Sequence, residues 1–88
     1  MNDILKGKTS TGFNYEVDKR RLENYELLEA FAEMETNAFA IVKVINLLLG
    51  TEQSIKLKDH VRKDGLVDNK KIMSEIQEIV ENSKDIKN

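Results

Sequence analysis

The side chains that could carry chemistry in this chain are few, and their spacing matches no catalytic or metal site. His60 is the only histidine, and there is no cysteine. A zinc site needs three or four ligands at suitable spacing, and nothing around His60 supplies them. A serine nucleophile would need His60 as its base, yet no serine lies in a Gly-x-Ser-x-Gly context. We therefore expect no enzyme activity and no cofactor, and we interpret His60 as an exposed or half-buried helix residue.

Glycines and glutamates indicate binding rather than catalysis. The four glycines are scattered, so they form no phosphate-binding loop. Residues 22–36 contain five glutamates and no basic residue. A solvated helix face explains such a run, but carboxylates on one surface could also meet a basic partner. Glu26, Glu29 and Glu33 are therefore candidates for contact with a bound protein.

The most apolar stretch, Asn37–Gly50, is the element around which the rest must be arranged. Between Ala38 and Leu49 only Lys43 and Asn46 are polar. A helix with one packed side shows an apolar stripe, whereas here apolar residues run nearly all the way round. The run is too short for a membrane span, which needs about 20 apolar residues. We expect other helices, a second copy of the chain or a bound partner to cover this helix.

Length and composition predict the fold class. The 88 residues show no break in composition, which predicts a single domain over residues 1–88. The net charge of -2 gives no drive toward nucleic acid or anionic membranes. The N-terminal residues lack an apolar stretch suited to a signal peptide, which favours an intracellular protein. Helical periodicity predicts a mainly α fold, a small bundle of about four helices with a short N-terminal strand or hairpin.

The first 17 residues differ from the rest. Apolar and polar residues alternate over Phe13–Val17, the period of a half-buried strand. Ile4–Thr9 could pair with it across a turn at Ser10–Gly12. Because a lone hairpin is marginal in water, residues 1–17 form either a hairpin lying on the helices or an extended arm.

Capping residues mark the expected helix starts. They are Asp18 or Asn24 for the first helix, Thr36 or Asn37 for the central helix, Thr51 for a short basic helix and Asp68 for the last. We expect Gly50 to end the central helix in the left-handed conformation. The last helix should fray near Asn82, which leaves residues 83–88 as a polar tail.

Apolar residues at helical spacing predict the face that each flanking helix buries. In the first helix these are Leu27, Leu28, Phe31 and Met34. In the basic helix they are Ile55, Leu57 and Val61, and in the last helix Ile72, Met73, Ile76, Ile79 and Val80.

The segment 38–63 also permits a second interpretation, a helix-turn-helix. Its second helix offers side chains that could contact bases and phosphates: Gln53, Lys56, Lys58, Arg62 and Lys63. The chain as a whole is acidic, however, and lysines on a short helix more simply confer solubility. A small DNA-binding regulator is thus the alternative function, and we do not expect nucleic acid as a partner.

Three blocks of sequence resemble the small tail assembly chaperones of phages and prophages of Gram-positive bacteria. They are TSTGFNYEVD (9–18), NYELLEAFAEME (24–35), and LLLGTEQSIKLKDHVRKDGLV (47–67) with the following helix MSEIQEIVE (73–81). The most specific positions are Leu47, Leu48, Gly50, Glu52, Gln53, Leu57, His60, Val61, Asp64, Gly65 and Val67. The chain departs from the pattern at Asn24, where Asp is expected, and at Thr36–Asn37, where relatives carry longer links.

The resemblance implies a non-enzymatic assembly factor that acts in the host cytoplasm and is absent from the mature virion. Such proteins bind the tape measure protein, a long and aggregation-prone helical chain, and keep it soluble until the tail tube forms. In some phages a longer, frameshifted form recruits the tail-tube protein. On this basis the alternative is a phage or prophage regulator that binds DNA. A head–tail connector is a third interpretation, which predicts the protein in the virion.

A central helix that is apolar on nearly all sides, in a small protein with a charged exterior, is suited to bind an amphipathic helix or a second copy of the chain. We therefore expect a homo-oligomer that binds its client through apolar side chains of two helices. The candidate protein-binding residues are Leu28, Phe31, Phe39, Val42, Ile45 and Leu49, with Glu26, Glu29 and Glu33 beside them.

Overall fold

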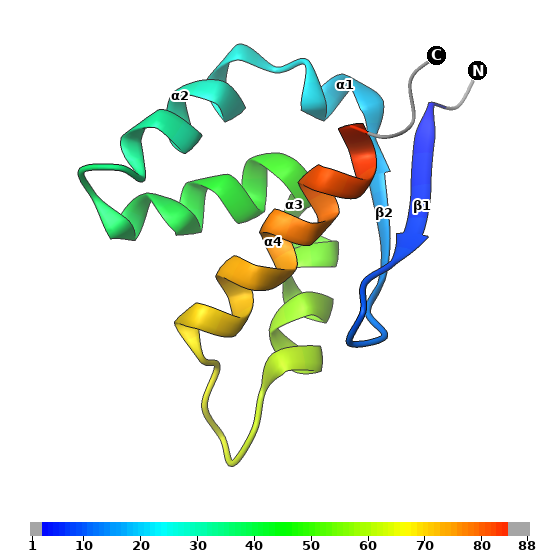
Figure 1. Cartoon of the computed structure of the whole chain (residues 1–88), viewed down its shortest axis with the longest axis vertical. Helices are drawn as coiled ribbons and strands as arrows, with labels where there is room; N and C mark the ends of the chain where they lie inside the picture. Colours follow the sequence, from blue (N-terminus) through cyan, green and yellow to red (C-terminus); the bar gives the residue numbers. More distant parts are fainter. Residues whose placement is uncertain (1–2, 85–88) are drawn as a thin grey trace.

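The computed structural model describes residues 3–84 and shows a β-hairpin packed on helices (Figure 1). The elements are β1 (Ile4–Lys8), β2 (Asn14–Asp18), α1 (Lys19–Leu22), α2 (Tyr25–Glu33), a 3₁₀ turn η1 (Ala38–Ala40), α3 (Ile41–Val61) and α4 (Asn69–Lys84). The expected mainly α fold with an N-terminal hairpin is confirmed for the described residues.

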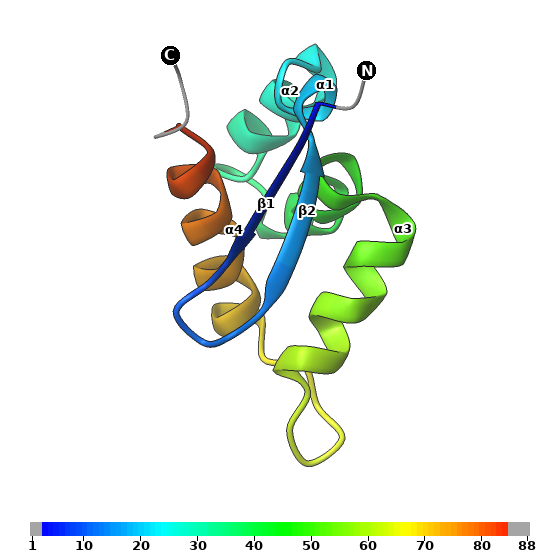
Figure 2. The same cartoon turned by 90° about the vertical axis from the view of Figure 1, so that its right-hand side faces the viewer.

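The two strands pair antiparallel, with Leu5 opposite Val17 and Gly7 opposite Tyr15. Phe13, Tyr15 and Val17 are buried, as their alternation predicts. Gly7 has no side chain, and this lets the Tyr15 ring lie against its backbone, where a Cβ atom would collide with the ring. Figure 2 shows the hairpin lying over α4 and the C-terminal half of α3. The hairpin is stable because the helices bury one of its faces, which excludes the extended arm for residues 3–17.

Asp18 and Asn24, alternatives in the sequence, both cap helices. The Asp18 carboxylate accepts from the backbone N–H of Arg20 at 2.9 Å, and the Asn24 side chain accepts from that of Glu26 at 3.0 Å. The Arg20 guanidinium also bonds the Asp18 carboxylate and lowers its pKa to about 2. The chain therefore makes a four-residue helix, α1, and then turns into α2.

The central helix is broken at Gly50. The residue has φ 83° and ψ 169°, so α3 consists of a first limb, residues 41–49, and a second limb, residues 51–61, that run in different directions (Figure 1). The positive φ agrees with the predicted left-handed conformation, but the extended ψ does not. The residue instead adopts a region of backbone space that is essentially confined to glycine.

Two polar side chains donate hydrogen bonds to backbone carbonyls of the first limb, close to the break at Gly50. Arg21 Nη1 donates to the carbonyl of Leu47 at 3.1 Å and to that of Asn46 at 3.5 Å. A cation there also interacts favourably with the C-terminal end of the first limb. The buried Ser54 hydroxyl donates to the carbonyl of Ile45 at 3.3 Å and ties the two limbs together.

Both limbs contribute to one hydrophobic cluster with β2, α2 and α4. Its most deeply buried side chains are Leu48, Leu57, Ile79, Val17 and Val44. Ile55 was predicted to belong to this core, and that prediction is wrong, because Ile55 is 51% exposed. The second limb instead turns Ser54 inward, one turn before Leu57.

Residues Ala38–Val61 are long and apolar enough, by length and composition, to cross a membrane. The prediction that the apolar stretch is too short to span a membrane counted only the residues up to Leu49. The helical element continues beyond Leu49 to Val61 and is therefore longer. In the folded chain this element is bent at Gly50 and both of its limbs contribute side chains to the hydrophobic core, with 33% of the apolar window buried. That the protein does not enter a membrane stays a prediction.

The link to α4 is a tight turn at Asp64–Gly65. Both residues have positive φ, and the N–H of Lys63 donates to the carbonyl of Leu66 at 2.8 Å. Such an Asp-Gly pair is typical of a type I′ turn. The Asp68 side chain then caps α4, as predicted, by accepting from the N–H of Lys70 at 2.7 Å.

The C-terminal end of α4 differs from the prediction. The helix continues to Lys84, past the expected fraying point at Asn82. Ser83, assigned from sequence to a polar tail, is buried, and its hydroxyl donates to the carbonyl of Ile79 at 2.8 Å. The burial of Ser83 packs this last turn against the rest of the molecule, which favours helix beyond Asn82. The rest of the predicted tail, residues 85–88, lies outside the described residues, as do residues 1–2 of the N-terminal segment.

Replacing Gly50 by Ala should lower the free energy of unfolding by about 1–3 kcal/mol. The new Cβ would sit at φ 83° and 3.0 Å from Arg21 Nη2. Urea denaturation followed by circular dichroism measures the loss. The predicted cap at Thr51 is wrong: Gly50 is the non-helical residue before the second limb, and the exposed Thr51 side chain makes no hydrogen bond within residues 3–84. Thr51→Ala is therefore the control and should change stability by less than about 0.5 kcal/mol. Equal stability of Gly50→Ala and the natural chain would show that the break is not required.

Candidate protein-binding surface

The folded chain leaves several large apolar side chains uncovered. Phe39 is 85% exposed, Leu28 63% and Val42 60%. Leu28 was predicted in the core-facing set of α2, and that is wrong. It follows the buried Leu27, and one residue rotates a side chain by about 100° around a helix. These three residues, all candidates from the sequence, are available to a partner.

The other apolar candidates are less accessible. Phe31 and Ile45 are half-buried and pack against the core. Leu49 is only 5% exposed, so its assignment to the binding surface is a correction. It lies next to the break at Gly50 and belongs to the hydrophobic core cluster. Leu49 therefore stabilises the fold and does not contact a partner.

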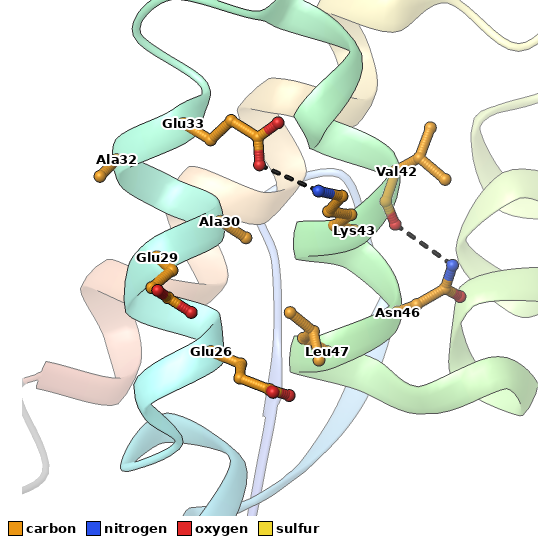
Figure 3. A pocket seen from close by; sticks show the side chains of 9 residues that line it. All are labelled: Glu26, Glu29, Ala30, Ala32, Glu33, Val42, Lys43, Asn46 and Leu47. Atoms are coloured by element: carbon orange, nitrogen blue, oxygen red, sulfur yellow. Dashed lines mark hydrogen bonds and ion pairs between the residues drawn. The ribbon is translucent and has the colours of Figure 1, made fainter.

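An open groove of ≈ 930 Å³ separates α2 from the first limb of α3 (Figure 3). We call it the acidic groove. Its lining combines three carboxylates with small and apolar side chains: Glu26, Glu29, Ala30, Ala32, Glu33, Val42, Lys43, Asn46 and Leu47. Thus the three glutamates proposed from sequence lie on one groove together with Val42.

The charges in the acidic groove are only partly neutralised. Lys43 Nζ lies 3.0 Å from Glu33 Oε1, and the Asn37 amide donates to the same carboxylate at 3.3 Å. The hydrogen bond from Lys43 lowers the pKa of Glu33, and Asn37 adds to the effect. Over residues 3–84, Glu26 and Glu29 make no ion pair. Three carboxylates and one ammonium group leave this wall with a net charge of -2.

A second, smaller depression of ≈ 280 Å³ lies on the other side of α2, against α4. We call it the apolar slot. It is lined by Phe31, Met34, Met73, Ile76, Gln77, Val80 and Glu81. Sequence reasoning grouped Phe31 with the central helix, whereas the structure places it in this slot. It also missed Met34 and Met73 as surface candidates, because both fit the apolar stripe of a buried face.

The only histidine contacts the tip of the hairpin, residues 9–13. Thr11 Oγ1 lies 3.0 Å from His60 Nε2 and donates to the carboxylate of Glu75 at 2.5 Å. His60 is exposed on a helix, as expected.

This network anchors the hairpin to the second limb and to α4. Ser10 adds two bonds to the Glu78 carboxylate, from its N–H at 2.6 Å and its hydroxyl at 3.0 Å. In residues 3–84 no group of three or more His, Asp or Glu side chains is placed to hold a metal ion.

The second limb gives no specific support to the helix-turn-helix interpretation. The Gln53 side chain accepts from the N–H of Glu16 at 3.1 Å, so it is engaged by the hairpin. Arg62 pairs with Asp59 at 3.3 Å. The basic residues therefore share their face with acidic ones. DNA binding stays an alternative prediction from sequence.

Comparisons with protein-family models, curated proteins and solved structures each find no match to this chain. The resemblance of the sequence blocks to tail assembly chaperones therefore stays a prediction, and the functional argument rests on the surfaces described above.

Replacing Thr11 by Val should lower the free energy of unfolding by about 1–3 kcal/mol, because the buried Glu75 carboxylate loses a donor. Glu75 is only 4% exposed, and its second oxygen already has no hydrogen-bond partner among the described residues. Thermal and urea denaturation measure the change. Thr51→Val makes the same substitution at an exposed position, and an equal loss there would contradict the anchoring role.

Proposed function

We propose that this protein is a non-enzymatic tail assembly chaperone of a phage or prophage. It binds the tape measure protein in the host cytoplasm, keeps it soluble during tail assembly, and is absent from the mature virion. The resemblance of three sequence blocks supplies the identity of the client. The structural support is the exposure of Leu28, Phe39 and Val42, three apolar side chains that the fold leaves outside its hydrophobic core.

An amphipathic helix is the client segment that suits these surfaces. The acidic groove and the apolar slot lie on opposite sides of α2. A client helix can therefore pack its apolar stripe against α2 on either side. Burying a Phe or Val side chain fully is worth roughly 1.5–3 kcal/mol, and association has its own entropic cost. A single copy should therefore bind weakly. Several copies along one long client would cover its apolar stripes while their charged exteriors keep the assembly soluble.

Self-association belongs to the same proposal. Without a client, the exposed apolar side chains can be covered by a second copy, which gives a homo-oligomer that the client displaces. A longer form, produced by frameshifting, that recruits the tail-tube protein is a further part of what the resemblance implies.

Co-expression with the tape measure protein of the same genome tests the client. The natural chain should raise the soluble fraction of the tape measure protein, and the double variant Phe39→Ser with Val42→Ser should abolish most of this effect. The matched control is Ile55→Ser with Leu66→Ser, which removes two side chains that are 51% and 73% exposed elsewhere. Equal activity of both double variants, or a tape measure protein that is soluble alone, would contradict the proposal.

Purified virions distinguish a chaperone from a structural component. Mass spectrometry of the particles should detect the tape measure and tail-tube proteins but not this chain. Its presence at a fixed stoichiometry with the tail tube would support the connector interpretation and overturn ours.

A further inference from the structure

We propose that the acidic groove selects client helices that carry a pair of Lys or Arg residues, one helical turn apart, beside their apolar stripe. This inference rests on the proposed function, since it names the kind of client segment that the same site accepts. The occupant is a basic amphipathic helix from another protein.

The spacing of the carboxylates carries the first step. Glu26, Glu29 and Glu33 are three and four residues apart, so they project from one side of α2 (Figure 3). Glu33 is already engaged by Lys43 at 3.0 Å and by Asn37 at 3.3 Å. Glu26 and Glu29 make no ion pair in residues 3–84. Two free carboxylates one turn apart match two cations at the same spacing on a partner helix.

The rest of the lining explains why the partner must also be amphipathic. Ala30 and Ala32 are small, so they leave room beside α2. On the opposite wall the half-buried Leu47 points toward α2, whereas Val42 lies at the rim with its side chain turned away (Figure 3). A partner helix can place apolar side chains against Leu47 and the alanines while its cations reach Glu26 and Glu29, and a uniformly polar helix would leave Leu47 without an apolar contact.

Lys43 gives the groove a direction. Its ammonium lies at the Glu33 end of the carboxylate row, whereas the free carboxylates lie toward the start of α2. Cations on the partner are attracted at the end near Glu26 and repelled at the end near Lys43. The preferred client segment therefore has its basic pair at one end of the apolar stripe.

The chain's own exposed helix surface is a poorer match. On the second limb the exposed Ile55 lies among both signs of charge, because Glu52 and Asp59 share the face with Lys58 and Arg62. Arg62 is moreover paired with Asp59 at 3.3 Å. Although Lys58 and Arg62 are four residues apart, Arg62 is already engaged by Asp59 and Glu52 lies on the same face. The second limb of another copy therefore offers fewer unpaired cations than a client helix with a free basic pair, which makes such a client the better occupant.

Two synthetic helical peptides test the inference. Both carry the same Leu/Ala stripe, and they differ only in a flanking pair of residues four apart, Lys in one and Glu in the other. Titration of each labelled peptide with the full chain is followed by fluorescence anisotropy. We expect the Lys peptide to bind about tenfold more tightly at low salt, and this preference should shrink as screening increases toward about 1 M salt.

Reversing the charge of the groove should reverse its preference between the Lys peptide and the Glu peptide. Glu26→Lys with Glu29→Lys should favour the Glu peptide, and the neutral pair Glu26→Gln with Glu29→Gln should remove the preference. The matched control, Glu35→Lys with Glu52→Lys, changes the net charge equally at exposed sites outside the groove and should keep the natural preference. Circular dichroism verifies that each variant is folded.

Several results would overturn the inference. The first is equal binding of the two peptides, and the second is a preference for the Lys peptide that survives charge reversal in the groove. The third is loss of this preference in the control variant as well. Oligomers of the natural chain that dissociate with Glu26→Lys and Glu29→Lys, without any effect on peptide binding, would show instead that a second copy occupies the groove. If the peptides bind equally but Phe39→Ser with Val42→Ser still abolishes tape measure solubilisation, charge selection fails and the chaperone proposal stands.

Discussion

The break at Gly50 is the constraint on which the rest of the structure depends. An unbroken helix over residues 41–61 would hold both limbs along one line, and the limbs could not enclose a common core with the hairpin and α4. The φ of 83° at Gly50 redirects the chain. Arg21 and Ser54 then satisfy carbonyls of the first limb, so that the bend leaves few backbone groups without a partner.

Because the limbs diverge, the first limb is covered on one side only. Ile41, Val44 and Leu48 face the core. The hairpin contacts the second limb, where Glu16 bonds Gln53 and Thr11 bonds His60. The remaining neighbour of the first limb is α2, which contacts it across the acidic groove. Val42 and Phe39 are therefore left at the surface by the architecture itself. Within residues 3–84 no other element covers these two side chains.

The acidic residues around this surface favour solubility although apolar side chains are exposed there. Glu26, Glu29 and Val42 all border the acidic groove, so charged groups lie on the same surface region as an exposed apolar side chain. The same carboxylates give the surface a preference among partners, because an apolar surface alone discriminates poorly between helices. The proposed selectivity for basic amphipathic segments follows from this combination.

Local signals predicted the elements well, and the packing of those elements less well. The alternation in Phe13–Val17, the caps at Asp18, Asn37 and Asp68, and the interruption at Gly50 are properties of a few neighbouring residues, and the structure has all of them. Which side of a helix is buried depends on where elements distant in the sequence pack against it.

The misplaced residues illustrate this limit. Ile55 is exposed while Ser54 is buried, because the break decides which side of the second limb meets the hairpin and α4. Leu49 is enclosed for the same reason. The anchoring of Thr11 by His60 and Glu75 joins residues 49 and 64 positions apart, and no local pattern indicates such a contact.

The most direct test is the solvent accessibility of Phe39, Val42 and Leu28 in the isolated protein and in complex with its client. Side-chain NMR with a soluble paramagnetic agent measures it for each residue. We predict strong paramagnetic relaxation of these three side chains in dilute free protein and marked protection once a tape measure segment is bound, with Leu48 protected throughout. Protection in the dilute free protein, or unchanged exposure in the complex, would contradict the claim that this chain leaves its apolar surface open for a client.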